Sequence, residues 1–252
     1  MTPREFIQSQ NIFGCNACQD IIHLQAEQNI NVIPLFWQGN GREHIPLVIM
    51  GGNPSVVGTL NEPRRGECNF DDYFDYYQNR AESETINEEQ ALVHNSGRER
   101  EDRITIPKKY WTMCHKLAKK IVGEDVQRWE DYVLMEAIHC FYNREDDLNV
   151  AQQNNVARAC FNKHTRNMLL FLKPRMIVLL GELPYKQLKQ LVDLEELEGN
   201  RFFMIRIEGE LNGTNNVLHI PVLRHRHPGF YGPFYSGNEV YEEFRKFAGF
   251  NR

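Results

Sequence analysis

Four short apolar runs, spread across the chain, constrain its fold more than any other feature. Each run is mostly hydrophobic, and two of the four are followed directly by glycine. Runs of this length and composition are typical of parallel strands that are buried on both faces, because helices cover both sides of such a sheet. The four predicted strands are Ile45–Met50, Tyr132–Ile138, Met176–Leu180 and Val217–Leu223.

The segments between these runs carry helical signals. Apolar residues recur with an amphipathic period in the first segment, and Pro174 is expected to end the helix in the second. Arg201–Ile207 is expected to be an additional or edge strand. The predicted helices are Tyr110–Val122, Ala151–Leu172, Leu183–Leu197 and Glu239–Phe247.

This alternation of strands and helices predicts an α/β fold. We expect one domain over residues 1–252, a three-layer α/β/α sandwich with a central, mostly parallel four-stranded sheet. The 252 residues, 41% of them hydrophobic, suffice for one buried core. Residues 79–103 are highly charged with few apolar anchors, and we interpret them as a polar insertion.

Composition narrows the class of protein. No apolar run approaches the roughly 20 residues that a membrane-spanning helix requires, and the first residues show no signal peptide. We therefore expect a cytoplasmic monomer with no membrane contact. The net charge of −5 argues weakly against a nucleic-acid partner, although basic residues gather at Arg64-Arg65, Arg98–Arg103 and Arg224–His227.

Four of the six cysteines fall at positions that suit a metal centre. Cys15 and Cys18 form a C-x-x-C pair, Cys140 ends the second predicted strand, and Cys160 lies in the helix that follows. Disulfides are not expected without a secretion signal, whereas a C-x-x-C turn places two thiolates on one side to bind one metal or cluster. Structural zinc, a redox pair and buried free thiols are the alternatives.

Two polar motifs follow predicted strands, where an open α/β sheet binds its ligands. Gly51-Gly52-Asn53-Pro54-Ser55 follows the first strand, and its glycines permit a close approach of the backbone to a ligand. His225-Arg226-His227-Pro228-Gly229-Phe230-Tyr231 follows the fourth strand. A plain connection to the next helix is the alternative for the first motif, and a histidine without function is the alternative for the second.

The cysteine pattern and these two motifs resemble the uracil-DNA glycosylase superfamily, from Cys15 to about Tyr231. The cysteines resemble its iron–sulfur branch, in which four cysteines hold a structural [4Fe–4S] cluster. The Gly-Gly-Asn-Pro turn resembles instead the first motif of the mismatch-specific and single-strand-selective branches. The resemblance implies an enzyme that flips a base out of DNA and hydrolyses its N-glycosidic bond.

The resemblance also assigns roles in the chemistry. Asn53 would orient the attacking water, and His227 would stabilise negative charge on the departing base. An aromatic side chain after the histidine, Phe230 or Tyr231, would wedge into the duplex as the base leaves.

Three residues are expected to bind the base. Gly52 would approach it closely, and Phe70 would stack on it, although a core position is an equal alternative for Phe70. Glu136 stands where the iron–sulfur branch has an asparagine that reads uracil. An ionised carboxylate only accepts hydrogen bonds, so it would repel O4 of uracil and accept a bond from the N4 amino group of cytosine. A shifted register or a protonated Glu136 is the alternative.

We therefore hypothesise that the substrate is a cytosine-type base. Excision of ordinary cytosine would destroy the genome, so a modified cytosine, a mismatch or a foreign DNA context must restrict the activity. We favour a modified cytosine, as in phage DNA, with a role in defence. Three other functions stay open: a uracil-DNA glycosylase in base excision repair, a silent DNA-binding protein on the same fold, and an unrelated zinc-stabilised nuclease or hydrolase. Ser55 and Gly229 depart from the family motifs and allow the silent protein.

Overall fold

The computed structural model describes residues 1–27, 34–52, 66–79, 105–140, 148–196, 201–226 and 238–250, with the backbone alone at 79, 105–111, 150 and 196. Four predicted site residues, Asn53, His227, Phe230 and Tyr231, lie outside these ranges, as do residues 80–103 of the predicted insertion.

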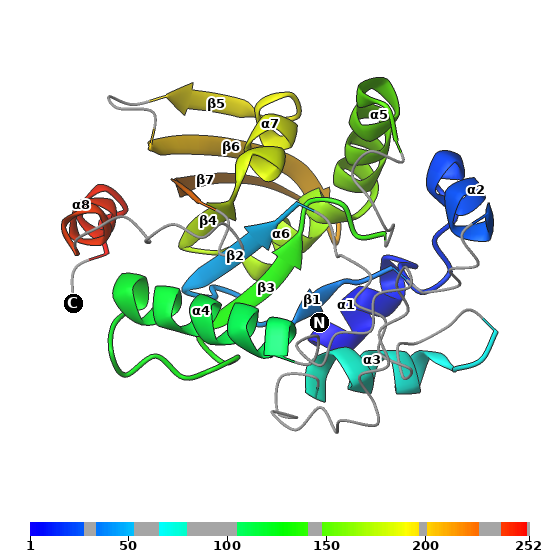
Figure 1. Ribbon diagram of the computed structural model, residues 1–252, viewed down its shortest axis with the longest axis horizontal. Helices are drawn as coiled ribbons and strands as arrows, with labels where there is room; N and C mark the ends of the chain where they lie inside the picture. Colours follow the sequence, from blue (N-terminus) through cyan, green and yellow to red (C-terminus); the bar gives the residue numbers. More distant parts are fainter. Residues whose placement is uncertain are drawn as a thin grey trace.

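A seven-stranded mixed sheet runs through the described part of the chain, in the order β1-β3-β2-β4-β7-β6-β5 (Figure 1). The inner strands β3, β2, β4 and β7 pair in parallel, whereas β1 at one edge and β6 and β5 at the other pair antiparallel. The fold is α/β as expected, but the sheet is larger than the predicted four strands because antiparallel strands extend it at both edges. The strands are β1 (Trp37–Gln38), β2 (Leu47–Gly51), β3 (Tyr132–Glu136), β4 (Met176–Leu180), β5 (Asp193–Glu196), β6 (Phe202–Leu211) and β7 (Thr214–His225).

The prediction of one helix over Leu183–Leu197 is wrong in its second half. Helix α7 (Glu182–Lys189) is followed by strand β5, which pairs with β6 from Phe203 to Arg206. Pairing with an adjacent strand overrides local preference, because strand formation depends on cross-strand contacts more than on the residues themselves.

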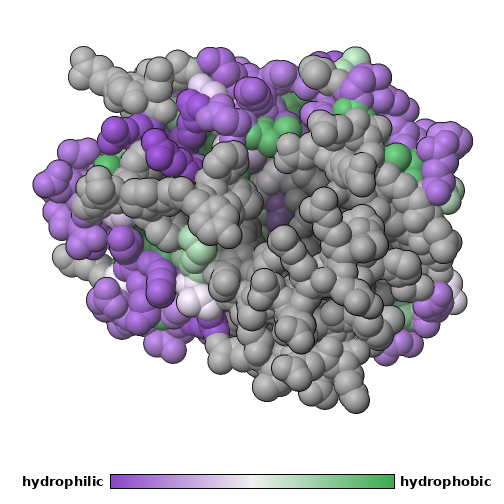
Figure 2. Space-filling model, in the orientation of Figure 1, coloured by the Kyte–Doolittle hydropathy of each residue, from purple (hydrophilic) through white to green (hydrophobic). Residues whose placement is uncertain are grey.

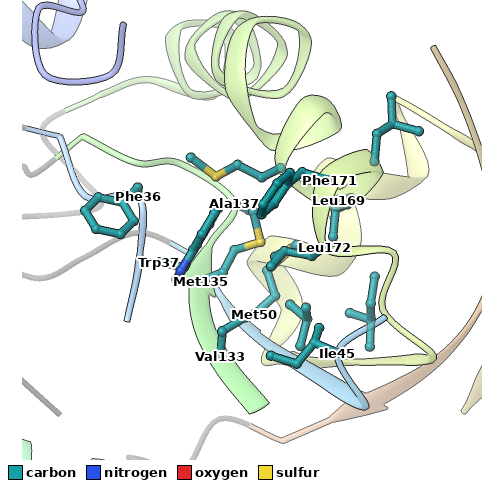
Figure 3. Close-up of a cluster of buried hydrophobic side chains, with 14 of the residues drawn as sticks. Phe36, Trp37, Ile45, Met50, Val133, Met135, Ala137, Leu169, Phe171 and Leu172 are labelled. Carbon is teal, nitrogen blue, oxygen red and sulfur yellow. The ribbon is translucent and has the colours of Figure 1, made fainter. Parts of the chain in front are cut away.

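Helices pack against both faces of the sheet. Successive residues of β2 point to opposite faces, so Met50 joins a core with α1, α3 and α6, while Ile49 joins a core with α4 and α8. Figure 3 shows part of the first core, in which Phe171 of α6 lies beside Trp37 of β1. The helices are α1 (Pro3–Ser9), α2 (Gln19–Glu27), α3 (Phe70–Asn79), α4 (Thr105–Val122), α5 (Val150–Cys160), the π-helix η4 (Phe161–Thr165), α6 (Arg166–Leu172), α7 and α8 (Glu239–Phe247).

The N-terminal helix is anchored to the first core. It begins with a capping box, in which the Thr2 side chain accepts from the Glu5 backbone and the Glu5 side chain accepts from the Thr2 backbone. Pro3 occupies the first helical position, where its missing N–H costs nothing. Phe6 stacks on Phe171 with ring centroids 4.3 Å apart. Helix α1 is therefore fixed by apolar packing.

The described surface is mostly hydrophilic on the face shown in Figure 2. Among the described helices, none combines the length and the apolar character that crossing a membrane requires.

Candidate functional site at the carboxyl edge of the sheet

The carboxyl ends of the parallel strands meet at one edge of the sheet. Strand β2 ends at Gly51, β3 at Glu136, β4 at Leu180 and β7 at His225. The chain runs from β2 outward to β3 and then crosses back to β4 on the other side of β2, which makes the end of β2 a topological switch point. Open α/β sheets bind ligands outside the carboxyl ends of the strands at such a point. The candidate site is therefore centred on the end of β2.

Glu136 packs directly against the end of β2. Its backbone pairs with Gly51, and the ladder continues as the Ala137 N–H donates to the Gly51 carbonyl at 3.0 Å. The Glu136 carboxyl group covers Gly51 so closely that an added Cβ would lie 2.8 Å from Cδ and closer still to Oε2. Glycine at position 51 thus makes room for this carboxyl group.

One oxygen of the Glu136 carboxyl group is held away from water without a partner among the described residues. The side chain keeps some exposed surface, but Oε2 is buried and forms no hydrogen bond with any described residue. Burial raises the pKa of Glu136 to about 8, because a low-dielectric environment disfavours the charged form. The group is therefore protonated at neutral pH in the free protein, and it offers one donor and one acceptor. This is the form that the sequence left as an alternative.

The start of α7 closes the other side of the switch point. An added Cβ on Gly52 would lie 2.7 Å from Leu183 Cδ2, so the backbone after β2 passes close to this helix. Arg224 of β7 forms an ion pair with Glu182, and its guanidinium lies over the Tyr185 ring, 4.4 Å from the centroid. These contacts fix Gly52 between β3 and α7, while its predicted role in binding a base stays a prediction.

The end of β7 carries a buried histidine. His225 is 2% exposed, its Nδ1 donates to the Arg226 carbonyl at 2.8 Å, and its Nε2 accepts from the Tyr241 hydroxyl at 3.0 Å. Burial lowers the pKa of His225, so the ring is neutral and serves to fix the end of the strand. The predicted catalytic His227 comes two residues later in the sequence, outside the described residues.

Phe70 begins α3 and belongs to an aromatic cluster. Its ring meets those of Phe13, Tyr73 and Phe74, and the Arg4 guanidinium lies 5.9 Å from its centroid. Within the described residues these ring contacts join α3 to the N-terminal segment. They favour the core alternative, and stacking of Phe70 on a base stays a prediction.

Three of the four predicted metal ligands come together. The Sγ atoms of Cys18, Cys140 and Cys160 lie within 4.8 Å of one another, and all three residues are buried. Cys18 directly precedes α2, Cys140 follows β3, and Cys160 ends α5, so the site joins three separate segments. None of the three forms a disulfide. These cysteines can bind a metal.

The charge state of the three thiols suits a soft metal. Hydrogen bonds from Cys140 and Cys160 lower the pKa of Cys18 to about 4, so a thiolate is present at neutral pH. Hydrogen bonds to Cys160 and Cys18, together with burial, raise the pKa of Cys140. A metal would replace the remaining thiol protons and neutralise the buried charge, because thiolates are the ligands of zinc and of iron–sulfur clusters. The donor set therefore fits such a centre.

Cys15, the fourth predicted ligand, contacts a histidine. Its Sγ lies 3.1 Å from Nε2 of His164, and the two residues are 4% and 1% exposed. Cys15 is not in the group whose ligand atoms all lie within 4.8 Å of one another. The C-x-x-C pair thus divides between the three-cysteine group and the histidine.

Two buried histidines beside the cysteines were missed by sequence reasoning. His139 precedes Cys140; its Nδ1 donates to the Leu35 carbonyl at 2.8 Å, and its Nε2 lies 3.0 Å from the Thr165 hydroxyl. The His164 ring lies perpendicular to it, with centroids 6.2 Å apart. Burial lowers the pKa of both rings, so both are neutral at neutral pH. His139 directly precedes Cys140, and His164 lies about one helical turn after Cys160, which is the signal that could have found them.

Comparison with protein-family models and with curated protein sequences found no match for this chain. Two features of the structure itself therefore bear on function. One is a buried carboxyl oxygen with no hydrogen-bond partner among the described residues, at a sheet edge that suits ligands, and the other is a buried thiol site that suits a metal.

Proposed function

We propose that the protein is a DNA glycosylase that hydrolyses the N-glycosidic bond of a flipped-out modified pyrimidine, a modified cytosine in preference to uracil. The observation that carries the proposal is Glu136 Oε2, which is buried beside Gly51 at the end of β2 and forms no hydrogen bond with any described residue. A buried polar group without a partner is costly, and a ligand that supplies the partner removes this cost. The switch point supports a ligand at this place.

A neutral Glu136 complements the edge of cytosine. Its carbonyl oxygen accepts from the N4 amino group, and its hydroxyl donates to ring nitrogen N3. The same group can also pair with uracil, by donating to O4 and accepting from N3–H. Repulsion of O4 by an ionised carboxylate, the reason given by the sequence, therefore does not apply at neutral pH. The preference must come from elsewhere.

The basicity of the base supplies that preference. Ring nitrogen N3 of cytosine can take the Glu136 proton as the glycosidic bond breaks, whereas N3 of uracil already carries hydrogen and its O4 is a weaker base. A protonated cytosine departs as a neutral molecule, so the proton transfer lowers the barrier. Glu136 is therefore proposed to act as a general acid as well as to read the base.

The remaining roles follow the resemblance. Asn53 orients a water molecule whose oxygen bonds to the anomeric carbon, and the electron pair of the broken bond leaves with the base. His227 donates a hydrogen bond to a base carbonyl and stabilises the charge that develops there. The proton released by the water passes to solvent, from which Glu136 is protonated again. Phe230 or Tyr231 fills the space that the base leaves in the duplex.

Cys18, Cys140 and Cys160, with Cys15 as a fourth ligand, are proposed to hold a structural [4Fe–4S] cluster. Hydrolysis requires no electron transfer, so the centre would fasten the N-terminal segment to the sheet. Zinc is the second candidate, and the compact thiol group favours it. Tetrahedral zinc with Zn–S bonds of about 2.3 Å places its thiolates roughly 3.8 Å apart, whereas a cluster distributes them over several irons. Iron, sulfide and zinc analysis of anaerobically purified protein separates the two.

Base release from duplexes that each carry one test base examines the proposal. The panel contains uracil, 5-hydroxymethyluracil, cytosine, 5-hydroxymethylcytosine and its glucosylated form, with alkali cleavage as the readout for abasic sites. Asn53→Ala is expected to abolish release. Glu136→Gln, which keeps a donor and an acceptor but cannot give up a proton, is expected to lower release of cytosine-type bases about 100-fold. Glu210→Gln on the exposed surface of β6 is the matched control and should leave the rate unchanged.

The alternatives give different results in the same assay. Faster release of uracil than of any cytosine, with little effect of Glu136→Gln, would assign the protein to uracil repair. DNA binding without release of any base, in protein that retains its metal, would indicate a silent binding protein.

A further inference from the structure

A π-helical turn directly after Cys160 directs two side chains toward the metal site. In η4 residue i bonds to residue i+5, so one turn is widened within the helix that α5 begins and α6 continues. His164 and Thr165 are both 1% exposed at this turn. Such π turns occur frequently at functional sites, and this one immediately follows a predicted metal ligand.

His164 is oriented by Cys15. Its Nε2 lies 3.1 Å from Sγ, whereas its Nδ1 is buried and has no hydrogen-bond partner among the described residues. An imidazole donates a hydrogen bond only through a ring nitrogen that carries a proton. Placed on Nε2, that proton points at the sulfur, and Nδ1 is left as an acceptor.

We propose that His164 is a positioning residue of the metal centre, whose Nε2–H donates to the Cys15 sulfur and holds Cys15 as the fourth thiolate ligand. The inference rests on the proposed metal centre. A metal-bound thiolate carries no proton, so the histidine must be the donor in this contact. Hydrogen bonds to ligand sulfurs strengthen metal binding and raise the reduction potential of an iron–sulfur cluster.

The same turn supports a second ligand. Thr165 follows His164, and its hydroxyl lies 3.0 Å from Nε2 of His139, the residue before Cys140. The other nitrogen of His139 bonds to the Leu35 carbonyl, so the ring is fixed on both sides. The π turn thereby links the segments that carry Cys15, Cys140 and Cys160.

The test compares His164→Phe and His164→Gln with the wild type, each purified anaerobically with its native metal. His115→Phe is the matched control, because His115 contacts Tyr132 and lies on α4, which carries none of the four predicted ligands. We expect His164→Phe to release metal to a chelator about 10-fold faster or more. An iron–sulfur centre should also show a lower reduction potential. His164→Gln keeps an N–H donor and should recover part of both losses, while His115→Phe behaves as the wild type.

Because His164 acts through Cys15, adding His164→Phe to Cys15→Ser should not accelerate metal release further. Equal release rates and potentials in the wild type and His164→Phe would overturn the inference. If the phenylalanine variant does not fold, ¹⁵N-histidine NMR of the wild type decides, since an Nε2 of His164 that carries no proton also overturns it. A wild type that contains neither iron nor zinc overturns the metal centre itself, which distinguishes the two failures.

Discussion

At the scale of single residues, the carboxyl group of Glu136 and the glycine at position 51 define the candidate site. Glu136 is stable in its position because Gly51 leaves space for it, and its raised pKa follows from burial without a cationic partner in the described part of the chain. A group held neutral in this way can give a proton to a base at neutral pH. Because ionisation of the buried group is unfavourable, its contribution to the free energy of unfolding changes with pH.

In Glu136→Gln the unfolding free energy should fall less than in the wild type as pH rises from 5 to 8.5. The pKa of Glu136 is about 8 in the folded protein, against an ordinary value of 4.5 in the unfolded chain. Between these two pH values only the folded state holds the proton. The stabilising effect of that proton is complete below about 4.5 and is lost as pH rises through 8. From pH 5 to 8.5 the wild type should lose on the order of 2 kcal/mol more unfolding free energy than Glu136→Gln, allowing for partial exposure. Urea denaturation at both pH values measures this, and equal losses would contradict it.

Gly51→Ala should destabilise the protein through Glu136. The added methyl would meet the carboxyl group well inside van der Waals contact, and forced displacement in a packed site costs about 1–3 kcal/mol. In a Glu136→Ala background the obstacle is gone, so the same substitution should cost much less. Thermal unfolding of the four proteins in this cycle gives the coupling. Additive effects would show that the two residues do not contact each other.

At the scale of elements, the two N-terminal helices are held by different means. Helix α1 buries Phe6 and Ile7 in the first core, together with Phe171. Helix α2 contributes Ile21 and Leu24 to a small cluster that also contains the three cysteines. A small apolar cluster stabilises a helix weakly, so α2 is expected to depend on the metal and α1 is not.

Removal of the metal by a chelator should therefore loosen α2 selectively. Amide hydrogen exchange is expected to accelerate in Gln19–Glu27 and to stay unchanged in Pro3–Ser9. Cys18→Ser should give the same pattern without a chelator. Unchanged exchange in α2 after complete metal loss would show that the centre does not hold this helix.

The inner strands of the sheet were predictable because each is a buried apolar run. The other elements were not predicted, and the reason differs from one element to the next. Helix α3 had a readable signal, since Phe70, Tyr73, Phe74 and Tyr77 recur at helical spacing, but the acidic residues between them suggested a polar stretch. Strand β1 is two residues long and too short to carry a pattern.

The β6–β7 hairpin also had a readable signal. Asn212-Gly213 adopts positive φ values of 55° and 74°, as a two-residue hairpin turn requires, and Asn-Gly is its strongest sequence mark. In contrast, no local feature of Asp193–Glu196 indicates a strand, because β5 exists through its pairing with β6. The π turn at Phe161–Thr165 is likewise a product of tertiary packing.

The site was predictable in outline from strand ends and cysteine spacing. Glu136 pairs with Gly51, the first residue of the first motif, and Cys18, Cys140 and Cys160 converge as expected. The ionisation of Glu136 was not predictable, because it depends on burial and on the lack of a partner. The contact between Cys15 and His164 joins residues 149 positions apart, which spacing cannot foresee.

At the scale of the whole molecule, the site and the metal centre occupy connected places. Strand β3 ends in Glu136 at the switch point, and the same segment continues through His139 to Cys140. A structural centre at this point would hold the backbone that carries the Glu136 carboxyl group, which is proposed to read the base. Loss of the metal should therefore weaken base release through misplacement of Glu136, without a direct part in the chemistry.

The most direct test is to identify the product released from a duplex that carries glucosylated 5-hydroxymethylcytosine. Mass spectrometry of the small-molecule fraction is expected to find the free modified base. The mass of the oligonucleotide is expected to fall by the mass of that base and to rise by the mass of one water molecule. The rate should fall as pH rises above 8, with the ionisation of Glu136. An oligonucleotide of unchanged mass after incubation with this substrate and with the other test bases, or one broken in its phosphate backbone, would contradict the proposed glycosylase.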